Sequence, residues 1–454
     1  MILFLEAPKA LNTLPSILFA AMTLSAWGLS ALAQPGAVDA TFDSNTAIIG
    51  SVHAMALQAD GKIVVGGSFT QVRGISQTVP ARIQTNGLLD RAYNRTSGVD
   101  GFVEAMAVQP DGKVIIGGSF ASYSGSTRAS VARIANDGSL DSSFNCSVDS
   151  YIYAMALQPD GKVVLAGVFN SVNGTARGHL ARVNSDGSIE RNFNSTLGAN
   201  DEIKTVTVLP NGKLVIAGSF TQYNSTNRQF VARLNADGNL DGTFKPDAIA
   251  GAFVSQVAYQ KDGKLFIVGP FTAVNGIARN GLARLNADGT LDTSFDQGPG
   301  LTDVTSIAVQ SDGKLLVGTT GAQAFLSRLK SSGEVDASFT PALLATNNAL
   351  QINLILLQPN GKITASLSSP GTGVAHLVRL LGDLPSVSLT ANRNGSISVS
   401  GAIGSKVRIE FNSDLATTNW ISLTNLVLPG SPYLLSDPQT SGSNNRFYRA
   451  ASLP

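Results

Sequence analysis

The chain has 454 residues, with 32 basic and 31 acidic side chains and a formal net charge of +1. This balance lacks the basic excess that nucleic acids or anionic membrane surfaces attract, so we expect no nucleic-acid partner. The one cysteine, Cys146, excludes an intramolecular disulfide framework. Its neighbours Asn145 and Ser147 indicate an unpaired thiol in a loop rather than a nucleophile.

The amino-terminal segment has the pattern of an export signal. Leu14 to Leu32 is mostly apolar, follows a lone Lys9 and ends in the small-x-small pattern Ala31-Leu32-Ala33. We expect residues 1–33 to be a cleaved signal peptide. The alternative is a membrane anchor, because the stretch is near the lower length limit for a spanning helix. No later segment is apolar enough to span a bilayer, so the predicted location is secreted or cell-surface.

An Asp/Asn-Gly-Lys turn returns along the chain at a step of about 50 residues. A unit of this length with four short strands has the size of one β-propeller blade, and such a ring buries its faces only when all blades are present. The predicted fold is therefore all-β, a seven-bladed β-propeller over residues 34–383. The turn glycines number repeats 1 to 7 in order: Gly61, Gly112, Gly161, Gly212, Gly263, Gly313 and Gly361.

Repeat 5 predicts the strands of one blade. Residues 254–259 alternate, residues 264–268 follow the turn at Gly263, and residues 281–285 precede a second turn at Gly289. Leu291 to Phe295 would close the blade as its fourth strand. Both turns suit a three-residue loop whose glycine takes the left-handed conformation.

Each third strand carries an arginine, and an acidic-x-x-aromatic pattern begins eight residues later. After Arg379 this pattern is missing, whereas a stray copy, Val38 to Phe42, stands near the amino terminus. We expect that copy to pair into the last blade and so close the ring. The pairs are interpreted as structural, holding strand register and neighbouring blades; a repeated metal or anion site is the weaker alternative. The residues are Arg82, Arg133, Arg182, Arg233, Arg284, Arg328 and Arg379, with Asp39, Asp90, Asp141, Glu190, Asp241, Asp292 and Asp336.

Three motifs in fixed order, 156–162, 232–238 and 291–295, resemble the delta-60 repeat family of bacterial propellers. The resemblance covers residues 36 to 383. It implies a secreted or surface-exposed bacterial protein and carries over no catalytic residue and no cofactor. Departures are local: Asn211 and Asn360 replace the turn aspartate, Glu190 replaces Asp, and repeat 6 has a shortened second loop around Gly321.

One position of the first strand varies between repeats although the residue before it is always Val or Ile. If first strands line the axis, these side chains form a ring at one channel mouth, a candidate site for a sugar or small polar ligand. The alternative is a strand that simply begins with a solvated residue. The position holds His53, Glu104, Tyr153, Lys204, Ser255, Thr305 and Asn353.

This ring has residue types that transfer protons, but it has a single carboxylate and a single histidine. Most glycosidases need a carboxylate pair, and zinc sites need three or more ligands. We therefore assign no catalytic residue, metal or cofactor. A second carboxylate would have to come from the loop acids, which also suit exposed turns: Asp100, Asp149, Asp201, Glu202 and Asp303.

Four arginines stand five residues before the third-strand arginine and would lie around one rim. An anionic polymer is one interpretation, but we favour bonds to carbonyls or acids of a neighbouring blade. They are Arg128, Arg177, Arg228 and Arg279.

The repeats stop at Leu384. Residues 387–390 and 396–399 flank an Asn-Gly turn as a hairpin, and residues 406–411 form another strand, so 384–454 is predicted to be a small β-sandwich-like domain, resembling modules that follow repeat arrays in exported bacterial proteins. Trp420 and Tyr448 are sugar-stacking candidates, with a core role favoured.

The sequence favours a monomeric, noncatalytic binding or scaffold module whose partner is a polysaccharide or a surface protein. An exported polysaccharide hydrolase or lyase and a structural adhesin component remain alternatives. The missing carboxylate pair disfavours the enzyme.

Overall fold

The computed structural model describes most of the chain, which divides into two compact units. One unit holds Gly36–Leu356 and Thr364–Leu380, and the other holds Met1–Pro35, Leu357–Ile363 and Leu381–Pro454. All regular elements among the described residues are strands, as expected for an all-β fold. The predicted signal peptide lies outside the described residues except for its second and third positions. The described residues are 2–3, 34–44, 46–93, 98–194, 197–298, 300–320, 326–341, 351–368, 371–383, 388–391, 396–400, 406–412, 420–427, 433–436 and 447–453.

Repeats 2 to 6 each form an antiparallel sheet of three strands, in which the second strand of the repeat is central. The central strands are short apolar runs with both faces buried, so their hydrophobic pattern is continuous rather than alternating. The strands, in repeat order, are β6 (Phe102–Val108), β7 (Val114–Ser119) and β10 (Val131–Ile134); β11 (Ile152–Leu157), β12 (Val163–Gly167) and β15 (Leu180–Val183); β16 (Ile203–Val208), β17 (Leu214–Gly218) and β20 (Val231–Leu234); β22 (Gln256–Tyr259), β23 (Leu265–Val268) and β26 (Leu282–Leu285); β27 (Val304–Val309), β28 (Leu315–Thr319) and β29 (Leu326–Leu329).

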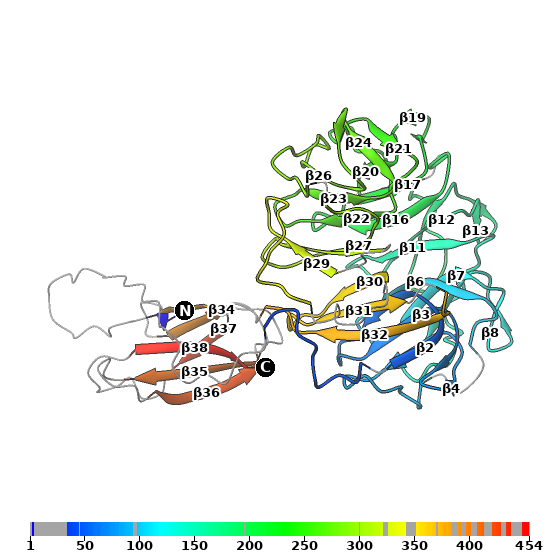
Figure 1. The fold of residues 1–454 in the computed structure, drawn as a ribbon. Coiled ribbons are helices and arrows are strands. Elements are labelled where there is room, and N and C mark those ends of the chain that lie inside the picture. The colour runs from blue at the N-terminus through cyan, green and yellow to red at the C-terminus, as the bar shows by residue number, and fades with distance from the viewer. Residues whose placement is uncertain are drawn as a thin grey trace. The chain divides into compact units, whose positions relative to one another are not determined.

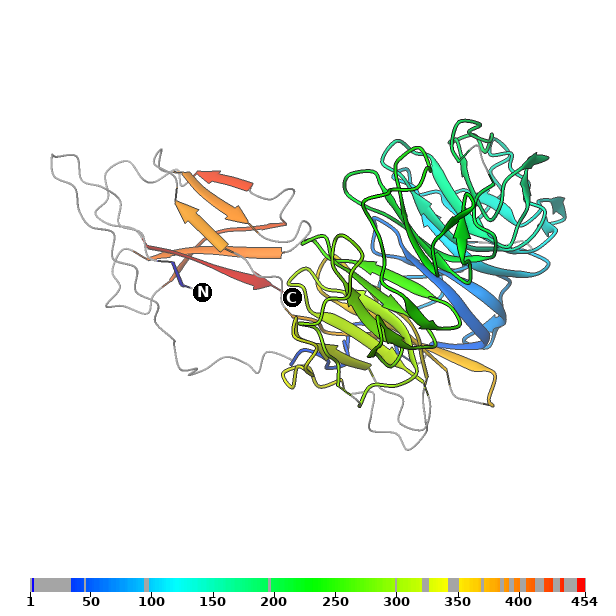
Figure 2. The same ribbon diagram turned by 90° about the horizontal axis from the view of Figure 1, so that it is seen from above.

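Repeats 7 and 1 share one sheet, which joins the two ends of the array. Its order is β30 (Gln351–Leu357), β31 (Ile363–Ser368), β32 (Val374–Leu380), β2 (Thr46–Leu57), β3 (Ile63–Val72) and β4 (Ile75–Ser76), with β5 (Ala81–Ile83) also paired to β3. Residues 46–49 of β2 pair with β32, and residues 48–57 pair with β3, so Ile48 and Ile49 have partners on both sides. The orange β32 lies beside the blue β2 in Figure 1, and blue and orange strands are again neighbours in Figure 2.

The stray segment near the amino terminus contacts the last repeat. Val38 forms a β-bridge with Leu380, and the Asp39 amide donates to the Arg379 carbonyl at 2.8 Å. The Arg379 guanidinium donates to the Asp39 carboxylate at 2.7 Å and lies over the Phe42 ring. These contacts repeat those that an arginine and an acid make within one repeat elsewhere.

The turns of repeat 5 take the predicted conformation, with φ of 92° at Gly263 and 99° at Gly289. The prediction of four regular strands per repeat was wrong. Leu291 makes only an isolated bridge to Leu285, and the chain then turns. The turn arises because the Asp292 carboxylate accepts a hydrogen bond from the Ser294 amide, which draws the backbone out of an extended conformation.

Short hairpins take up the long loop between the second and third strands. In repeat 5 one of them reaches back to the segment that precedes the first strand. They consist of β8 (Ser122–Tyr123) with β9 (Ser126–Thr127), β13 (Ser171–Val172) with β14 (Thr175–Ala176), β18 (Gln222–Tyr223) with β19 (Thr226–Asn227), and β24 (Phe271–Val274) with β21 (Ile249–Gly251) and β25 (Ile277–Ala278).

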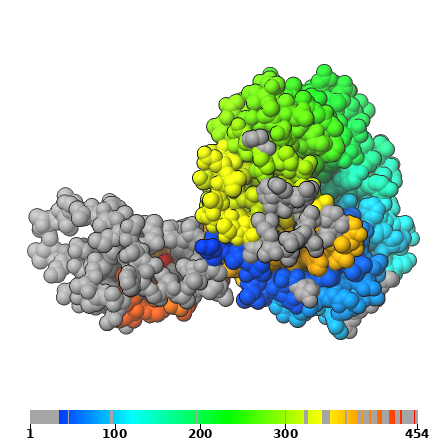
Figure 3. Space-filling view, viewed as in Figure 1, coloured from blue at the N-terminus to red at the C-terminus, as the bar shows by residue number. Residues whose placement is uncertain are grey.

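The core of the array lies between neighbouring sheets. In β12, Val163 and Leu165 pack into a cluster with repeat 2, whereas Val164 and Ala166 pack into a cluster with repeat 4. Repeat 7 reaches repeat 1 in the same way, because Leu354 and Leu356 pack against the cluster that holds most buried residues of repeat 1. Figure 3 shows the repeats as contiguous patches of colour that follow one another from blue through green to yellow.

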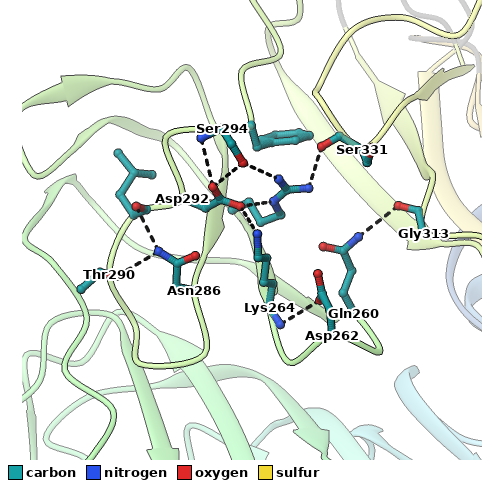
Figure 4. Close-up of polar contacts among 12 residues, drawn as sticks. Gln260, Asp262, Lys264, Asn286, Thr290, Asp292, Ser294, Gly313 and Ser331 are labelled. Carbon is teal, nitrogen blue, oxygen red and sulfur yellow. Dashed lines mark hydrogen bonds and ion pairs between the residues drawn. The ribbon is translucent and has the colours of Figure 1, made fainter.

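The repeated arginines and acids form a network at the second turn. In repeat 5, Arg284 donates to the Asp292 carboxylate at 2.7 Å, Lys264 reaches the same oxygen at 2.8 Å, and Ser294 reaches the other. The Arg284 guanidinium also lies 5.0 Å from the centroid of the Phe295 ring. Figure 4 shows Lys264 and Ser294 converging on Asp292.

The same arginines link repeats 1 to 5 each to the next one, and repeat 7 to repeat 1. Arg284 donates to the Ser331 carbonyl of repeat 6 at 2.8 Å, and Gln260 donates to the Gly313 carbonyl of repeat 6 (Figure 4). Arg379 of repeat 7 donates to the Thr85 carbonyl of repeat 1. The remaining links are Arg82 to Asn136, Arg133 to Ser185, Arg182 to Ala236 and Arg233 to Ala287.

The second unit contains two small sheets whose facing residues form one apolar cluster, which includes the buried Tyr448. That burial agrees with the core role favoured for Tyr448. The domain boundary at 383 stays a prediction. The sheets are β33 (Ser388–Ala391), β34 (Ser396–Ser400) and β37 (Tyr433–Ser436), and β1 (Ile2–Leu3), β38 (Phe447–Leu453), β35 (Lys406–Asn412) and β36 (Ile421–Val427).

Candidate functional site

The variable first-strand position is the extra residue of a β-bulge. In repeat 3 the register between β11 and β12 shifts between Ile152 and Ala154, which leaves Tyr153 without a partner on β12. A bulge bends the strand and re-aims a side chain, so this position is free of the ladder that fixes its neighbours. The same shift occurs at His53, Glu104, Lys204 and Thr305.

A glycine on the second strand makes room for the bulge in repeats 1 to 4, whereas repeat 6 has Thr319 at this place. A Cβ on Gly167 would lie 2.0 Å from the Tyr151 carbonyl oxygen, and a Cβ on Gly218 would lie 2.1 Å from that of Glu202. Real Cβ atoms do not approach an oxygen so closely, so only glycine allows this packing. The backbone carbonyl of the residue two places before the bulge, such as Tyr151, therefore packs directly against the glycine of the second strand.

Side chains from repeats 1 to 5 meet where the first strands begin. Two positions of the repeat contribute, the bulge residue and the residue two places before it. We call this group the first-strand cluster: His53, Phe102, Glu104, Tyr151, Tyr153, Glu202, Lys204 and Phe253.

One half of the cluster combines an imidazole, a carboxylate and two rings. His53 Nδ1 lies 2.9 Å from Glu104 Oε2, without the alignment of a hydrogen bond, and both side chains are partly exposed. The Phe102 ring stands edge-on to His53 and 6.1 Å from the Tyr151 ring, measured between centroids. Tyr151 is 45% exposed, so its ring face is available to a ligand.

The other half is an ion pair held between aromatic rings. Lys204 Nζ lies 2.6 Å from Glu202 Oε1, 5.1 Å from the Tyr153 centroid and 4.8 Å from the Phe253 centroid. Burial opposes ionisation of Glu202, but bonds from Lys204 and Ser219 outweigh it and lower the pKa of that carboxyl. Burial, together with the Glu202 carboxylate, raises the pKa of the Tyr153 hydroxyl, which stays a neutral donor.

The other three predicted ring residues are bonded within the array. Ser255 donates to the Val268 carbonyl, Thr305 donates to the Gly318 carbonyl, and Asn353 donates to the Ser368 hydroxyl. The cluster is therefore lopsided. Charged and aromatic groups gather in repeats 1 to 5, with Phe253 as the contribution of repeat 5, while the predicted ring position of repeats 5 to 7 holds short neutral side chains.

Sequence reasoning missed Phe102, Tyr151 and Phe253, and treated Glu202 only as a loop acid. The signal is present one place before the uniform Val/Ile position, where the repeats hold Ser51, Phe102, Tyr151, Glu202, Phe253, Asp303 and Gln351. Comparing the copies at this position as well would have found the three aromatic residues.

The other loop acids support turns. Asp100 accepts from the amides of Ala121 and Ser122, and Asp149 accepts from the Asn170 amide. Such bonds fix the loop between the second and third strands, which gives these acids a structural role. Asp201 accepts from the next amide, that of Glu202, and Asp303 accepts from the Thr302 hydroxyl.

The four rim arginines bond to their own repeat rather than to a neighbour, which corrects the favoured interpretation. Arg177 donates to the carbonyls of Ala176 and Arg191, and Arg279 to those of Ala278 and Phe295. Arg128 and Arg228 likewise donate to the preceding carbonyl. The hairpin that precedes each arginine folds the side chain back onto its own loop.

A further sequence candidate, Cys146, is described by its surroundings. Cys146 is a free buried thiol, and burial raises its pKa to about 12, so it is a poor nucleophile. Over the described part of the chain, no group of three or more His, Cys, Asp or Glu side chains has a geometry for a metal ion, and no helix is long and apolar enough to cross a membrane.

The model of one protein family matches the array. The family is described as a domain of unknown function (DUF5122) beta-propeller, and it matches residues 58–93, 109–144, 158–193, 209–244, 260–295 and 310–339. These segments are DUF5122 β-propeller repeats. Each match runs from the first turn to the aromatic residue after the acid, so the DUF5122 unit leaves out the first strand and with it the first-strand cluster.

None of the curated proteins matches the chain. Among solved structures, a streptogramin B lyase is similar at 13% identity and a TM-score of 0.45, over 74% of this chain and 97% of that one. A catalytically inactive virginiamycin B lyase from Staphylococcus aureus, with quinupristin, reaches 15% and 0.46 over the same shares. A gluconolactonase from Xanthomonas campestris reaches 14% and 0.38, over 73% and 99%. Likenesses at these TM-scores carry no argument about function.

Proposed function

We propose that the chain is a noncatalytic binding module, exported to the cell surface or beyond, on a seven-bladed DUF5122 propeller closed by Val38–Phe42. The closure is supported by β32, which pairs with β2, and by Asp39, which takes the place of the acid missing after Arg379. The arginine link from Arg379 to Thr85 continues the chain of links that runs between the other repeats. Export is supported by the apolar segment and its Ala31-Leu32-Ala33 pattern.

The first-strand cluster carries the binding role. It joins partly exposed rings to hydrogen-bonding groups from five repeats, at a position that the bulge frees from the sheet. Sites of this kind orient a ligand with a few polar groups set among aromatic surface. A merely solvated strand end gives no reason for the side chains of five repeats to meet.

The arrangement favours binding over catalysis. Glu202, whose pKa is lowered, is an ion-paired carboxylate and a poor proton donor. A glycosidase of the common type needs one carboxyl kept protonated and a second that is ionised, flanking the bond to be cleaved. One observation favours the enzyme alternative, namely the 2.9 Å approach of His53 to Glu104, which resembles a base and its orienting acid.

The test is a pull-down of the mature protein, Gln34–Pro454, on insoluble polysaccharides and bacterial envelopes, with an assay for released sugar ends. Retention without release supports the binding module. Release of sugar ends overturns the noncatalytic role and directs attention to His53 and Glu104. Absence of both overturns the proposal in favour of a structural role.

A control separates the two units of the protein. The triple variant His53→Ala, Glu104→Ala, Lys204→Ala alters three partly exposed side chains of the propeller and should keep the melting temperature. If the variant folds and still binds, the cluster is not the site. Binding that survives this variant but is lost on deleting residues 384–454 would place the site in the second unit.

A further inference from the structure

The first-strand cluster selects a class of ligand, and this step rests on the proposed function. We propose that it binds a neutral glycan, with one sugar ring stacked on Tyr151 and its hydroxyls bonded to His53 and Glu104. The argument uses the exposure of the rings, the hydrogen-bonding groups beside them and the charge of the cluster.

The stacking surface is the Phe102–Tyr151 pair. Phe102 is wedged between His53 and Tyr151, with its centroid 6.1 Å from each ring, so it supports Tyr151 from the side. Tyr151 is 45% exposed, and its aromatic ring is the most accessible of the cluster. A flat ring that is fixed by a neighbour offers contact area at a small cost in conformational entropy, which suits the C–H face of a sugar.

The polar groups beside this surface match hydroxyls. Glu104 accepts hydrogen bonds and His53 donates or accepts them, and both are partly exposed beside Phe102. The two atoms at 2.9 Å lack hydrogen-bond alignment, and His53 Nδ1 is itself buried, so a ligand would bond to the exposed parts of the two side chains. A hydroxyl both donates and accepts, and it would serve the two groups at once.

The charge of the cluster excludes acidic sugars. It contains two carboxylates, Glu104 and Glu202, and its one lysine is already paired with Glu202 at 2.6 Å between Tyr153 and Phe253. A uronate stacked on Tyr151 would meet the Glu104 carboxylate, and like charges at this range repel. Lys204 occupies the space between Tyr153 and Phe253, so a ligand cation does not fit between these two rings.

The experiment is calorimetric titration of the exported chain with soluble oligomers of glucose, mannose, xylose and galactose. Oligogalacturonate is the control, because it carries carboxylates where the galactose oligomer is neutral. We expect at least one neutral oligomer to bind and oligogalacturonate to bind at least about tenfold more weakly than the galactose oligomer. Equal or tighter binding of the uronate overturns the inference.

Variants locate the binding. Tyr151→Ala should lower the affinity for the neutral oligomer at least about tenfold. Tyr151→Phe keeps the ring face and should lower the affinity much less. Leu197→Ala is the control, because Leu197 is 74% exposed and lies outside the cluster. If Tyr151→Ala binds as the parent does, this inference fails while the binding module stands. If only envelope proteins are retained and no oligomer binds, the ligand class fails and the module stands.

Discussion

At the scale of single residues, the array repeats one set of contacts. An arginine donates to a carboxylate eight residues away, lies over the aromatic ring that follows and reaches a carbonyl of the next repeat. One guanidinium thus fixes the turn, the position of the aromatic ring and the spacing between neighbouring sheets. Recurrence at a fixed spacing made this pairing predictable from the sequence. The sequence predicted that these arginines hold neighbouring blades, but not which carbonyl each one contacts, because that contact depends on how two sheets pack.

Removing one acid from this set should be costly. In Asp292→Ala, the nearly buried Arg284 and the amine of Lys264 lose their shared carboxylate. We expect a loss of about 3–5 kcal/mol in the free energy of unfolding, because an uncompensated charge stays buried. Urea unfolding followed by circular dichroism measures it. The control Glu334→Gln breaks an exposed pair with Lys330 and should change stability by less than about 0.5 kcal/mol. Equal effects would contradict the argument.

The same acids predict how stability depends on pH. Burial raises the pKa of these carboxyls, but bonds from lysine, arginine and serine outweigh it, so the pKa of each lies below its ordinary value, 3.8 for aspartate and 4.5 for glutamate. Their contribution is complete above that value and is lost as pH falls through the lowered pKa. We expect a melting temperature that holds between about pH 5 and 7 and falls steeply below about pH 4. A melting temperature that rises on acidification would contradict this. The acids are Asp90, Asp141, Glu190, Asp241, Asp292 and Asp336.

At the scale of elements, the sequence predicted the strands better than their interruptions. Alternation and turn glycines located the first three strands of repeat 5, while the fourth is a bridge and a turn because Asp292 bonds the Ser294 amide. The bulge was not predicted. One unpaired residue leaves the apolar pattern nearly unchanged, and the glycine that accommodates it, such as Gly167, resembles any other strand glycine in the sequence.

The bulge glycine gives a prediction for one element. Gly167→Ala places a methyl group 2.0 Å from the Tyr151 carbonyl oxygen, so β11 and β12 must separate. We expect a lower melting temperature, with a loss on the order of 1–3 kcal/mol, and weaker ligand binding because Tyr151 moves. Differential scanning calorimetry and titration measure both effects. Gly242→Ala is the control, because nothing lies within 4 Å of its added Cβ. Equal melting temperatures and affinities of the two variants would show that the bulge accommodates a Cβ without strain.

At the scale of the whole molecule, the ends of the array meet. Asp39 and Arg379 are 340 residues apart in sequence, yet their pairing was predicted, because counting repeats showed an acid missing at one end and surplus at the other. The contacts of the first-strand cluster were not predictable in this way. They join residues of adjacent repeats that share no motif, and only the bulge and the packing of the sheets bring them together.

Removing the segment Val38–Phe42, which contacts the last repeat, should destabilise the array as a whole. A chain that begins at Ser44 lacks Asp39, so Arg379 loses its carboxylate and the edge of β32 loses its bridge to Val38. We expect a lower melting temperature and self-association, because an unpaired edge invites other strands. Light scattering after size exclusion and calorimetry measure these changes against a chain that begins at Gln34. An unchanged melting temperature and mass would show that the segment does not close the ring.

The bulge has a consequence for how such a protein can change. Two neighbouring residues of one strand have different roles. Ile152 is buried and packs in the core of the array, whereas Tyr153 at the bulge is not paired with β12. Under the proposed binding role, substitution at the bulge would alter what the surface recognises while the apolar neighbour and the turn network keep the fold. Binding specificity could therefore change through single substitutions in individual repeats with little change in the free energy of unfolding. This property would suit the array as a scaffold for engineered recognition.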